Sequence, residues 1–267
     1  MPHLSRPGID HYFDSVGHGQ PVLLLAGLAS DSASWNPVVA KLSERANIIR
    51  MDNRCAGQSR PSIIDTSRAL MVDDVLALLD SLGIDKVTLV GHSMGALIAW
   101  AVAAKAPERI KALVAVSAPF TVDPARVDLF NTLARLRTQA NEADWFRLLF
   151  QFLFSARFFD NEEQVISAID ASMAYPHKQS HDAFAAQCAA LPSYLAPIHL
   201  PTKLPFDALA LTGANDKLFT PNDLHQSYAN HPEVTLKVID DAAHSVHWEN
   251  AEGFVEVVSD FLANQTR

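Results

Sequence analysis

A serine lies between two glycines at the end of an apolar stretch of the chain. Residues 87–103 begin as a β-branched apolar run, pass through Gly91-His92-Ser93-Met94-Gly95 and end in apolar helix formers. A G-x-S-x-G spacing between a buried strand and a helix predicts a sharp turn that exposes the serine hydroxyl above a sheet edge. Glycines on either side let the strand and the helix approach closely. Ser93 is therefore the candidate nucleophile, in preference to a purely structural turn.

A serine hydroxyl is a poor nucleophile at neutral pH, so it needs a general base, and the base needs a group that orients it. Of the eleven histidines, two follow the last predicted strand, His244 and His247. The others precede the nucleophile, lie within the elbow or fall in helical patterns. His244 is nearer the strand end and has small neighbours, so it is the predicted base. His247 is interpreted as a pocket wall or a solvated helix cap.

The acid that orients the base is predicted at Asp216. This residue follows the strand predicted at 206–213, and the carboxyl ends of parallel strands meet at one edge of the sheet. Asp240 and Asp241 are too close in sequence to His244 to reach its ring easily. Asp223 is better interpreted as an acid in the first turn of a helix.

Attack on a carbonyl creates an oxyanion, which needs preorganised hydrogen-bond donors. The backbone N–H of Met94, the residue after the nucleophile, is the first candidate donor. The second candidate is the N–H of Leu28, in the loop that follows the apolar run 21–27.

Short apolar runs alternate with helical patterns along most of the chain. The runs are continuously apolar, which is typical of strands buried on both faces of a parallel sheet. The predicted strands are 21–27, 46–52, 86–91, 111–117, 206–213 and 234–240, with an antiparallel strand at 11–16. The predicted helices are 34–44, 67–82, 94–106, 221–230 and 249–263. This order predicts an α/β protein with a mostly parallel, eight-stranded-type sheet and helices on both faces.

The alternation breaks between residues 119 and 196, where only helical patterns occur. We predict a helical cap over 119–196, inserted into a core made of 1–118 and 197–267. Predicted cap helices cover 144–154, 161–173 and 180–190, and one more starts at Asp123-Pro124. The segment 144–159 holds six of the fourteen phenylalanines. Two interpretations stay open for it, packing within the cap or lining an apolar pocket.

Four residues are candidates for the pocket wall, and they are Phe120, Trp145, Leu149 and His247. Arg147 and Arg157 interrupt the aromatic run. Either side chain could bind a substrate carboxylate, but solvation at the surface is the favoured interpretation.

The chain resembles the α/β-hydrolase superfamily over nearly its whole length. Besides the elbow, residues 51–59 are similar to the D-x-R-G-x-G-x-S stretch of that superfamily, and 27–35 resemble its oxyanion loop. Residues 212–221 and 242–254 resemble its acid and histidine segments. The small bacterial members, which include 3-oxoadipate enol-lactonases, carboxylesterases and carbon–carbon bond hydrolases, are the most similar in character. The resemblance implies Ser93, Asp216 and His244 as the triad, Leu28 and Met94 as the oxyanion hole, and a helical cap.

Two residues depart from the superfamily pattern. Ala26 stands where many members have a histidine, and Cys55 replaces the first glycine of the Arg-Gly pattern. Neither change removes the predicted catalytic groups. A serine in the elbow, rather than an aspartate, argues against haloalkane dehalogenase or epoxide hydrolase chemistry.

Composition narrows the possible partners. The formal net charge is −9 without a basic run, which argues against nucleic-acid binding. We find no signal peptide pattern and no apolar run of membrane-spanning length, and two distant cysteines fit a reducing cytoplasm. The expected partner is a small-molecule substrate, with no cofactor, metal or membrane.

The expected reaction is hydrolysis of an ester or lactone of a small, partly apolar molecule through an acyl-enzyme. The alternatives are a carbon–carbon bond hydrolase of ring-cleavage products, a cofactor-free haloperoxidase or perhydrolase, and a ligand receptor that kept the fold without turnover.

Overall fold

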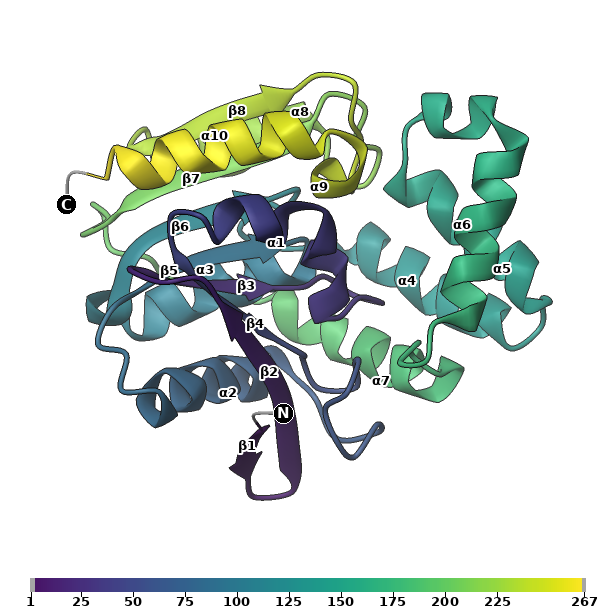
Figure 1. Ribbon diagram of the computed structural model, residues 1–267, viewed down its shortest axis with the longest axis horizontal. Helices are drawn as coiled ribbons and strands as arrows, with labels where there is room; N and C mark the ends of the chain where they lie inside the picture. The colour runs from purple at the N-terminus through teal and green to yellow at the C-terminus, as the bar shows by residue number, and fades with distance from the viewer. Residues whose placement is uncertain (1–2, 266–267) are drawn as a thin grey trace.

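A computed structural model describes residues 3–265, and within them eight strands form one sheet (Figure 1). Their order across the sheet is β1-β2-β4-β3-β5-β6-β7-β8. β1 and β4 pair antiparallel with β2, and all other pairs are parallel, which confirms the predicted mostly parallel sheet. The strands are β1 (His3–Arg6), β2 (Ile9–Val16), β3 (Pro21–Leu25), β4 (Asn47–Met51), β5 (Val87–His92), β6 (Ile110–Val116), β7 (Asp207–Gly213) and β8 (Val234–Ile239).

Helices cover both faces of this sheet. They are α1 (Asn36–Leu42), α2 (Arg68–Ser81), α3 (Met94–Lys105), α8 (Pro221–Tyr228), α9 (Val246–Glu249) and α10 (Ala251–Ala263). Alternate residues of β3 point to opposite faces, as the pleat of a strand requires. Leu23 and Leu25 belong to the apolar cluster that includes α2 and α3, whereas Val22 and Leu24 pack with α1 and α10. The continuous apolar run of β3 therefore contributes side chains to two apolar cores, one on each face of the sheet.

Between β6 and β7, a stretch described in full, the chain forms four α-helices and no strand. These are α4 (Pro124–Arg137), α5 (Glu142–Leu153), α6 (Glu162–Ala174) and α7 (His181–Ala190). They lie together beyond one edge of the core, on the right in Figure 1. Each begins with a side-chain cap on its first turn, from Asp123, Asn141, Asn161 and Ser180. No helix within residues 3–265 is both long and apolar enough to cross a membrane.

Local structure differs from the sequence prediction in three places. The edge strand β1 was not predicted, because its pattern is short and half exposed. The helix predicted at 34–44 begins as a 3₁₀ turn, Ser32–Trp35, and ends at Leu42. The helix predicted at 249–263 is preceded by the short α9, and Asn250 separates the two by capping the Gly253 N–H.

A buried acid joins the edge strands to the rest of the core. Asp74 on α2 is 1 % exposed. Its carboxylate accepts hydrogen bonds from Arg6 and Arg54, and His11 Nε2 lies 3.1 Å from Asp74 Oδ2. Burial raises the pKa of Asp74, but hydrogen bonds from His11 and Arg54 outweigh it and hold the pKa below its ordinary value. The ionised form therefore stabilises the fold.

Replacing Asp74 with Asn should lower the free energy of unfolding at pH 7 by roughly 3 kcal/mol, because two arginines lose a buried counter-charge. The greater stability of wild type is present above the pKa that Asp74 has in the unfolded chain. It is lost as the pH falls through the lower pKa of Asp74 in the folded protein. Urea unfolding at several pH values measures both effects. Asp80→Asn is the matched control, since Asp80 is an exposed partner of Arg109. Equal stability of the two variants would contradict the assigned role.

Candidate active site

Ser93 lies in a strained turn between β5 and α3. Its φ is +52° and its ψ −118°, a conformation that L residues rarely adopt. A Cβ on Gly91 would lie 2.3 Å from the Gly95 carbonyl oxygen, and a Cβ on Gly95 would lie 2.1 Å from the Leu25 oxygen. No side chain fits at either position, so the two glycines allow α3 to fold back against β5 and β3. This geometry presents the Ser93 side chain at the carboxyl end of the sheet.

Asp216 and His244, from the loops after β7 and β8, are hydrogen-bonded to each other. His244 Nδ1 lies 2.9 Å from Asp216 Oδ2. The same carboxylate accepts from Thr212 Oγ1 and from the backbone N–H groups of Leu218 and Phe219, at 2.8–2.9 Å. Both side chains are at most 3 % exposed. Four donors therefore hold the carboxylate in one orientation.

The two loops also touch through their backbones. A Cβ on Gly213 would lie 2.3 Å from the carbonyl oxygens of Ala242 and Ala243, so this position accepts only glycine without a shift. Asn215 N–H donates to the Ala242 oxygen at 2.9 Å. The acid and the histidine thus lie on loops that pack directly against each other.

His92 connects the elbow with the His244 loop. His92 Nε2 lies 2.9 Å from the His244 carbonyl oxygen, and the two ring centroids are 4.8 Å apart. Burial and the neighbouring His247 and His244 lower the pKa of His92 well below its ordinary value. The ring is therefore neutral and donates from Nε2. Sequence reasoning placed His92 within the elbow and missed this contact.

Ser93 lies beside His92 and against the loop after β3. A Cβ on Gly27 would lie 3.2 Å from Ser93 Cβ and 3.1 Å from His92 Nδ1. Among residues 3–265, Ser93 Oγ has no hydrogen-bond partner, so the structure does not close a Ser93–His244 hydrogen bond. Such contacts are often long without substrate and shorten on binding. The three predicted groups therefore share one edge of the sheet, with the acid and the base already joined.

The two candidate oxyanion donors flank Ser93. Met94 is the first residue of α3, where a backbone N–H has no partner within the helix. Leu28 follows Gly27, which packs directly on Ser93. Asn53 Nδ2 donates to the Ala26 oxygen at 3.0 Å and anchors this loop from the side. The donor role of both N–H groups stays a prediction.

His247 is buried behind the site, so the solvated alternative is wrong. Its side chain is 1 % exposed and packs 4.6 Å from the Trp35 ring and 4.7 Å from the His92 ring. Burial, together with His244, lowers the pKa of His247 to about 3. The ring is thus neutral and supports the His92–Trp35 contact.

The other candidate pocket residues lie in separate packing clusters. Phe120 contacts Trp100 and Tyr228, with ring centroids 4.7 and 4.4 Å apart. Trp145 is 1 % exposed inside the cap, with its Nε1 bonded to the Leu133 oxygen and Arg137 over its ring. Leu149 is buried on the same helix. Their pocket role stays a prediction.

The backbone conformation at Cys55 explains why the superfamily pattern has glycine at this position. Its φ is +62°, in the left-handed region, and its thiol donates to the Ile64 oxygen at 3.2 Å. Burial raises the pKa of the Cys55 thiol, so the side chain is an inert packing group and not a nucleophile. Cys188 is also buried and free.

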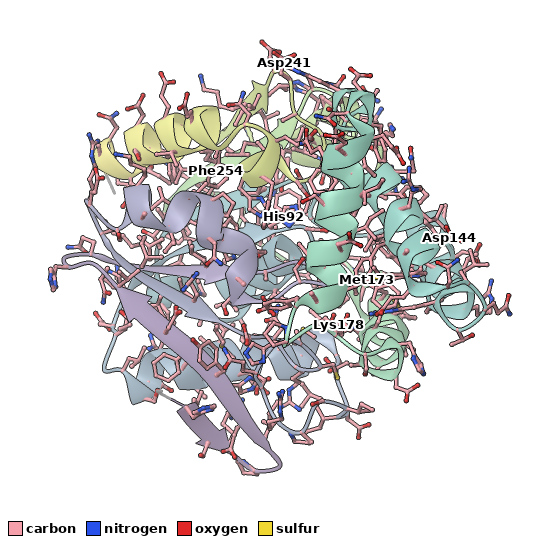
Figure 2. All side chains as sticks on the ribbon, turned by 45° about the vertical axis from the view of Figure 1, so that its right-hand side comes forward. His92, Asp144, Met173, Lys178, Asp241 and Phe254 are labelled. Atoms are coloured by element: carbon pink, nitrogen blue, oxygen red, sulfur yellow. The ribbon has the colours of Figure 1, made fainter. Side chains whose placement is uncertain are left out.

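The cap contacts the loop that carries Leu28. Gln187 on α7 is fully buried; its amide oxygen accepts from Ala29 N–H at 3.4 Å and its amide nitrogen donates to the Arg54 oxygen at 2.7 Å. In Figure 2, α6 runs in front of the core beside His92 and carries Met173 near its end. Tyr175, just after α6, lies near Asp31 in the same loop.

Comparisons with known proteins show which fold family the chain resembles. A family model described as alpha/beta hydrolase fold matches residues 20–251. A protein of Azorhizobium caulinodans provisionally named as a carbamate hydrolase is 26 % identical over 98 % of this chain and 98 % of its own. A 2-hydroxy-6-oxononadienedioate/2-hydroxy-6-oxononatrienedioate hydrolase of Pseudomonas putida is 30 % identical over 94 % of this chain and 91 % of its own.

Structural similarity extends over the same length. The crystal structure of the enol-lactonase from Burkholderia xenovorans superimposes with a TM-score of 0.83 at 24 % identity, over 98 % of this chain and 100 % of that chain. At this identity the similarity concerns the fold.

Replacing Asp31 with Asn should stabilise the protein at neutral pH. Burial and the nearby Asp52 raise the pKa of Asp31 to about 6, although hydrogen bonds from Tyr175 and Ala33 and the charge of His177 oppose the rise. The raised pKa adds stability below about pH 4, and this is lost as the pH rises through 6. The free energy of unfolding of the variant, relative to that of wild type, should therefore rise by on the order of 2 kcal/mol when the pH is raised from 4 to 7.5. Urea unfolding at both pH values measures this gain, and a pH-independent difference would contradict the assignment.

Proposed function

The chain belongs to the alpha/beta hydrolase fold family, and on that premise we propose that it is a serine hydrolase acting on an ester or lactone of a small, partly apolar molecule. The observation that carries this proposal is the 2.9 Å hydrogen bond between Asp216 and His244 at the sheet edge where the strained elbow presents Ser93. A nucleophile, a base and an orienting acid together are the minimal set for acyl transfer.

In the proposed mechanism, His244 Nε2 removes the Ser93 hydroxyl proton while Oγ bonds to the substrate carbonyl carbon. Asp216 holds Nδ1–H and stabilises the imidazolium that forms. The oxyanion accepts hydrogen bonds from the Leu28 and Met94 N–H groups. His244 then gives its proton to the leaving oxygen as the carbon–oxygen bond breaks. In a second half-reaction, His244 activates a water that releases the acid and returns the proton to Ser93.

The cap supports a partly apolar substrate. The buried face of α5 consists of Trp145, Phe146, Leu149 and Phe150. Phe150, Phe154 and Phe158 form a continuous aromatic stack at the end of this helix, with centroids 4.4–5.9 Å apart. Both arginines of this region are at the surface, since Arg147 pairs with Glu162 and Arg157 is 77 % exposed. This arrangement favours a substrate bound through apolar contacts and not through a carboxylate clamp.

Replacing Ser93 with Ala should abolish ester hydrolysis, because no other group can form the acyl-enzyme. We expect kcat/KM for p-nitrophenyl acetate to fall by at least about 10⁴-fold, with an unchanged Tm. Ser81→Ala, at the exposed end of α2, is the matched control. A fluorophosphonate probe should label wild type and the control but not Ser93→Ala. Full turnover by Ser93→Ala would refute the proposal.

A second candidate function is hydrolysis of a carbon–carbon bond in a dienone product of ring cleavage. It is favoured by the similarity to the 2-hydroxy-6-oxononadienedioate hydrolase, a relative that matches almost the whole chain. The same serine, histidine and acid would act on a ketone carbonyl.

A substrate panel separates the two candidates. Purified enzyme is assayed with short p-nitrophenyl esters, five- and six-membered lactones and ring-cleavage dienones of equal concentration. The first proposal predicts a kcat/KM at least about tenfold higher for an ester or lactone than for any dienone, because the buried α5 face offers no charged group for a dicarboxylate. The reverse order would establish the second candidate.

A further inference from the structure

The Glu249 carboxylate joins the histidine loop to the cap. Glu249 ends α9, and its Oε2 accepts from the Ala243 N–H at 2.6 Å. Its Oε1 accepts from both the N–H and the Oγ–H of Ser155, at 2.9 and 2.7 Å. Ser155 is 4 % exposed and lies just after α5, at the end of the cap helix that holds the aromatic cluster. The Glu249 side chain thus accepts hydrogen bonds from three donors, one in the histidine loop and two at Ser155 in the cap.

Contacts with the cap segment lie immediately before and after the candidate base in the chain. Ala243 immediately precedes His244, and Ser245, which immediately follows it, donates its N–H to the Leu153 oxygen at 2.9 Å. The His244 carbonyl accepts from His92, and Nδ1 is bonded to Asp216. The backbone on both sides of His244 is therefore attached to the Leu153–Ser155 segment of the cap. Nε2, the atom that must reach Ser93 Oγ, has no hydrogen-bond partner among the described residues.

We propose that Glu249 is a positioning residue for His244. Through Glu249, the position of the base depends on how the cap packs against the core. The inference rests on the proposed serine-hydrolase function. Glu249 does not touch the reacting atoms. A carboxylate suits this role because it has two acceptor oxygens, one for each segment, and hydrogen bonds to a charged acceptor are stronger than those between neutral groups. Displacement of a catalytic group by about 1 Å can lower the rate about a hundredfold.

Glu249→Gln is the sharpest test, because it keeps the shape but removes one acceptor. A glutamine has one oxygen, so it can accept from Ala243 or from Ser155 but leaves the other donor facing an NH₂ group. We expect kcat for p-nitrophenyl acetate to fall roughly tenfold to a hundredfold, with KM within about threefold of wild type. Kinetics and thermal unfolding are measured on the same samples.

Two further variants separate positioning from charge and from stability. Glu252→Gln removes the same charge from an exposed site on α10 and should leave kcat unchanged. Ser155→Ala removes only the Oγ contact and should lower kcat by a few-fold while the protein stays folded. If Glu249→Gln does not fold, Ser155→Ala decides the matter, and a wild-type kcat in that variant overturns the proposal.

Proton NMR gives a readout that does not depend on turnover. The His244 Nδ1 proton shared with Asp216 should give a low-field signal in wild type and Glu252→Gln, and this signal should broaden or vanish in Glu249→Gln. Hydrogen exchange at Ala243 and Ser155 should accelerate in the same variant. An intact signal with unchanged kcat overturns the positioning role. A wild type that neither hydrolyses esters nor reacts with a fluorophosphonate would refute the proposed function alone, since the NMR result still decides how Glu249 acts on His244.

Discussion

The close approach of three backbone segments at the elbow is the constraint on which the rest of the site depends. α3 turns back against β5 and β3 at distances that exclude even one carbon at Gly91 and Gly95. Ser93 consequently takes a strained φ that only the surrounding core can enforce, because all of β5 and the first two turns of α3 are buried. A looser contact would relax the turn and withdraw the hydroxyl from the sheet edge. The close packing that stabilises the core therefore also places Ser93 at the sheet edge.

Neutral, buried side chains surround the candidate base. His92, His247 and Trp35 form one ring cluster, and burial keeps both of these histidines uncharged. A positive charge here would oppose the imidazolium that His244 must carry during the reaction. Within residues 3–265, the carboxylate hydrogen-bonded to His244 is that of Asp216, at Nδ1. Of the three histidines in this cluster, His244 is the one that is hydrogen-bonded to a carboxylate.

The cap contacts two of the loops that carry candidate catalytic groups. Gln187 contacts the loop of the candidate oxyanion donor Leu28, Tyr175 contacts Asp31 in the same loop, and Glu249 binds Ser155 beside His244. Two of these contacts join the cap to the loop after β3, and the third joins it to the segment that carries His244. Because the three contacts are polar and directional, they specify one seating of the cap more strictly than apolar packing alone would.

The sequence by itself determined the order of elements, the elbow and the candidate acid and base, because these follow from local periodicity, glycine spacing and position after a strand. The strands at 21–27 and 86–91 and the cap helices were located to within a few residues for this reason. Only the tertiary structure decided the roles of His92, His247, Gln187 and Glu249. Their types and neighbours in sequence are unremarkable, and their contacts join segments up to 158 residues apart. Such long-range hydrogen bonds depend on how the loops and the cap pack, which no local pattern encodes.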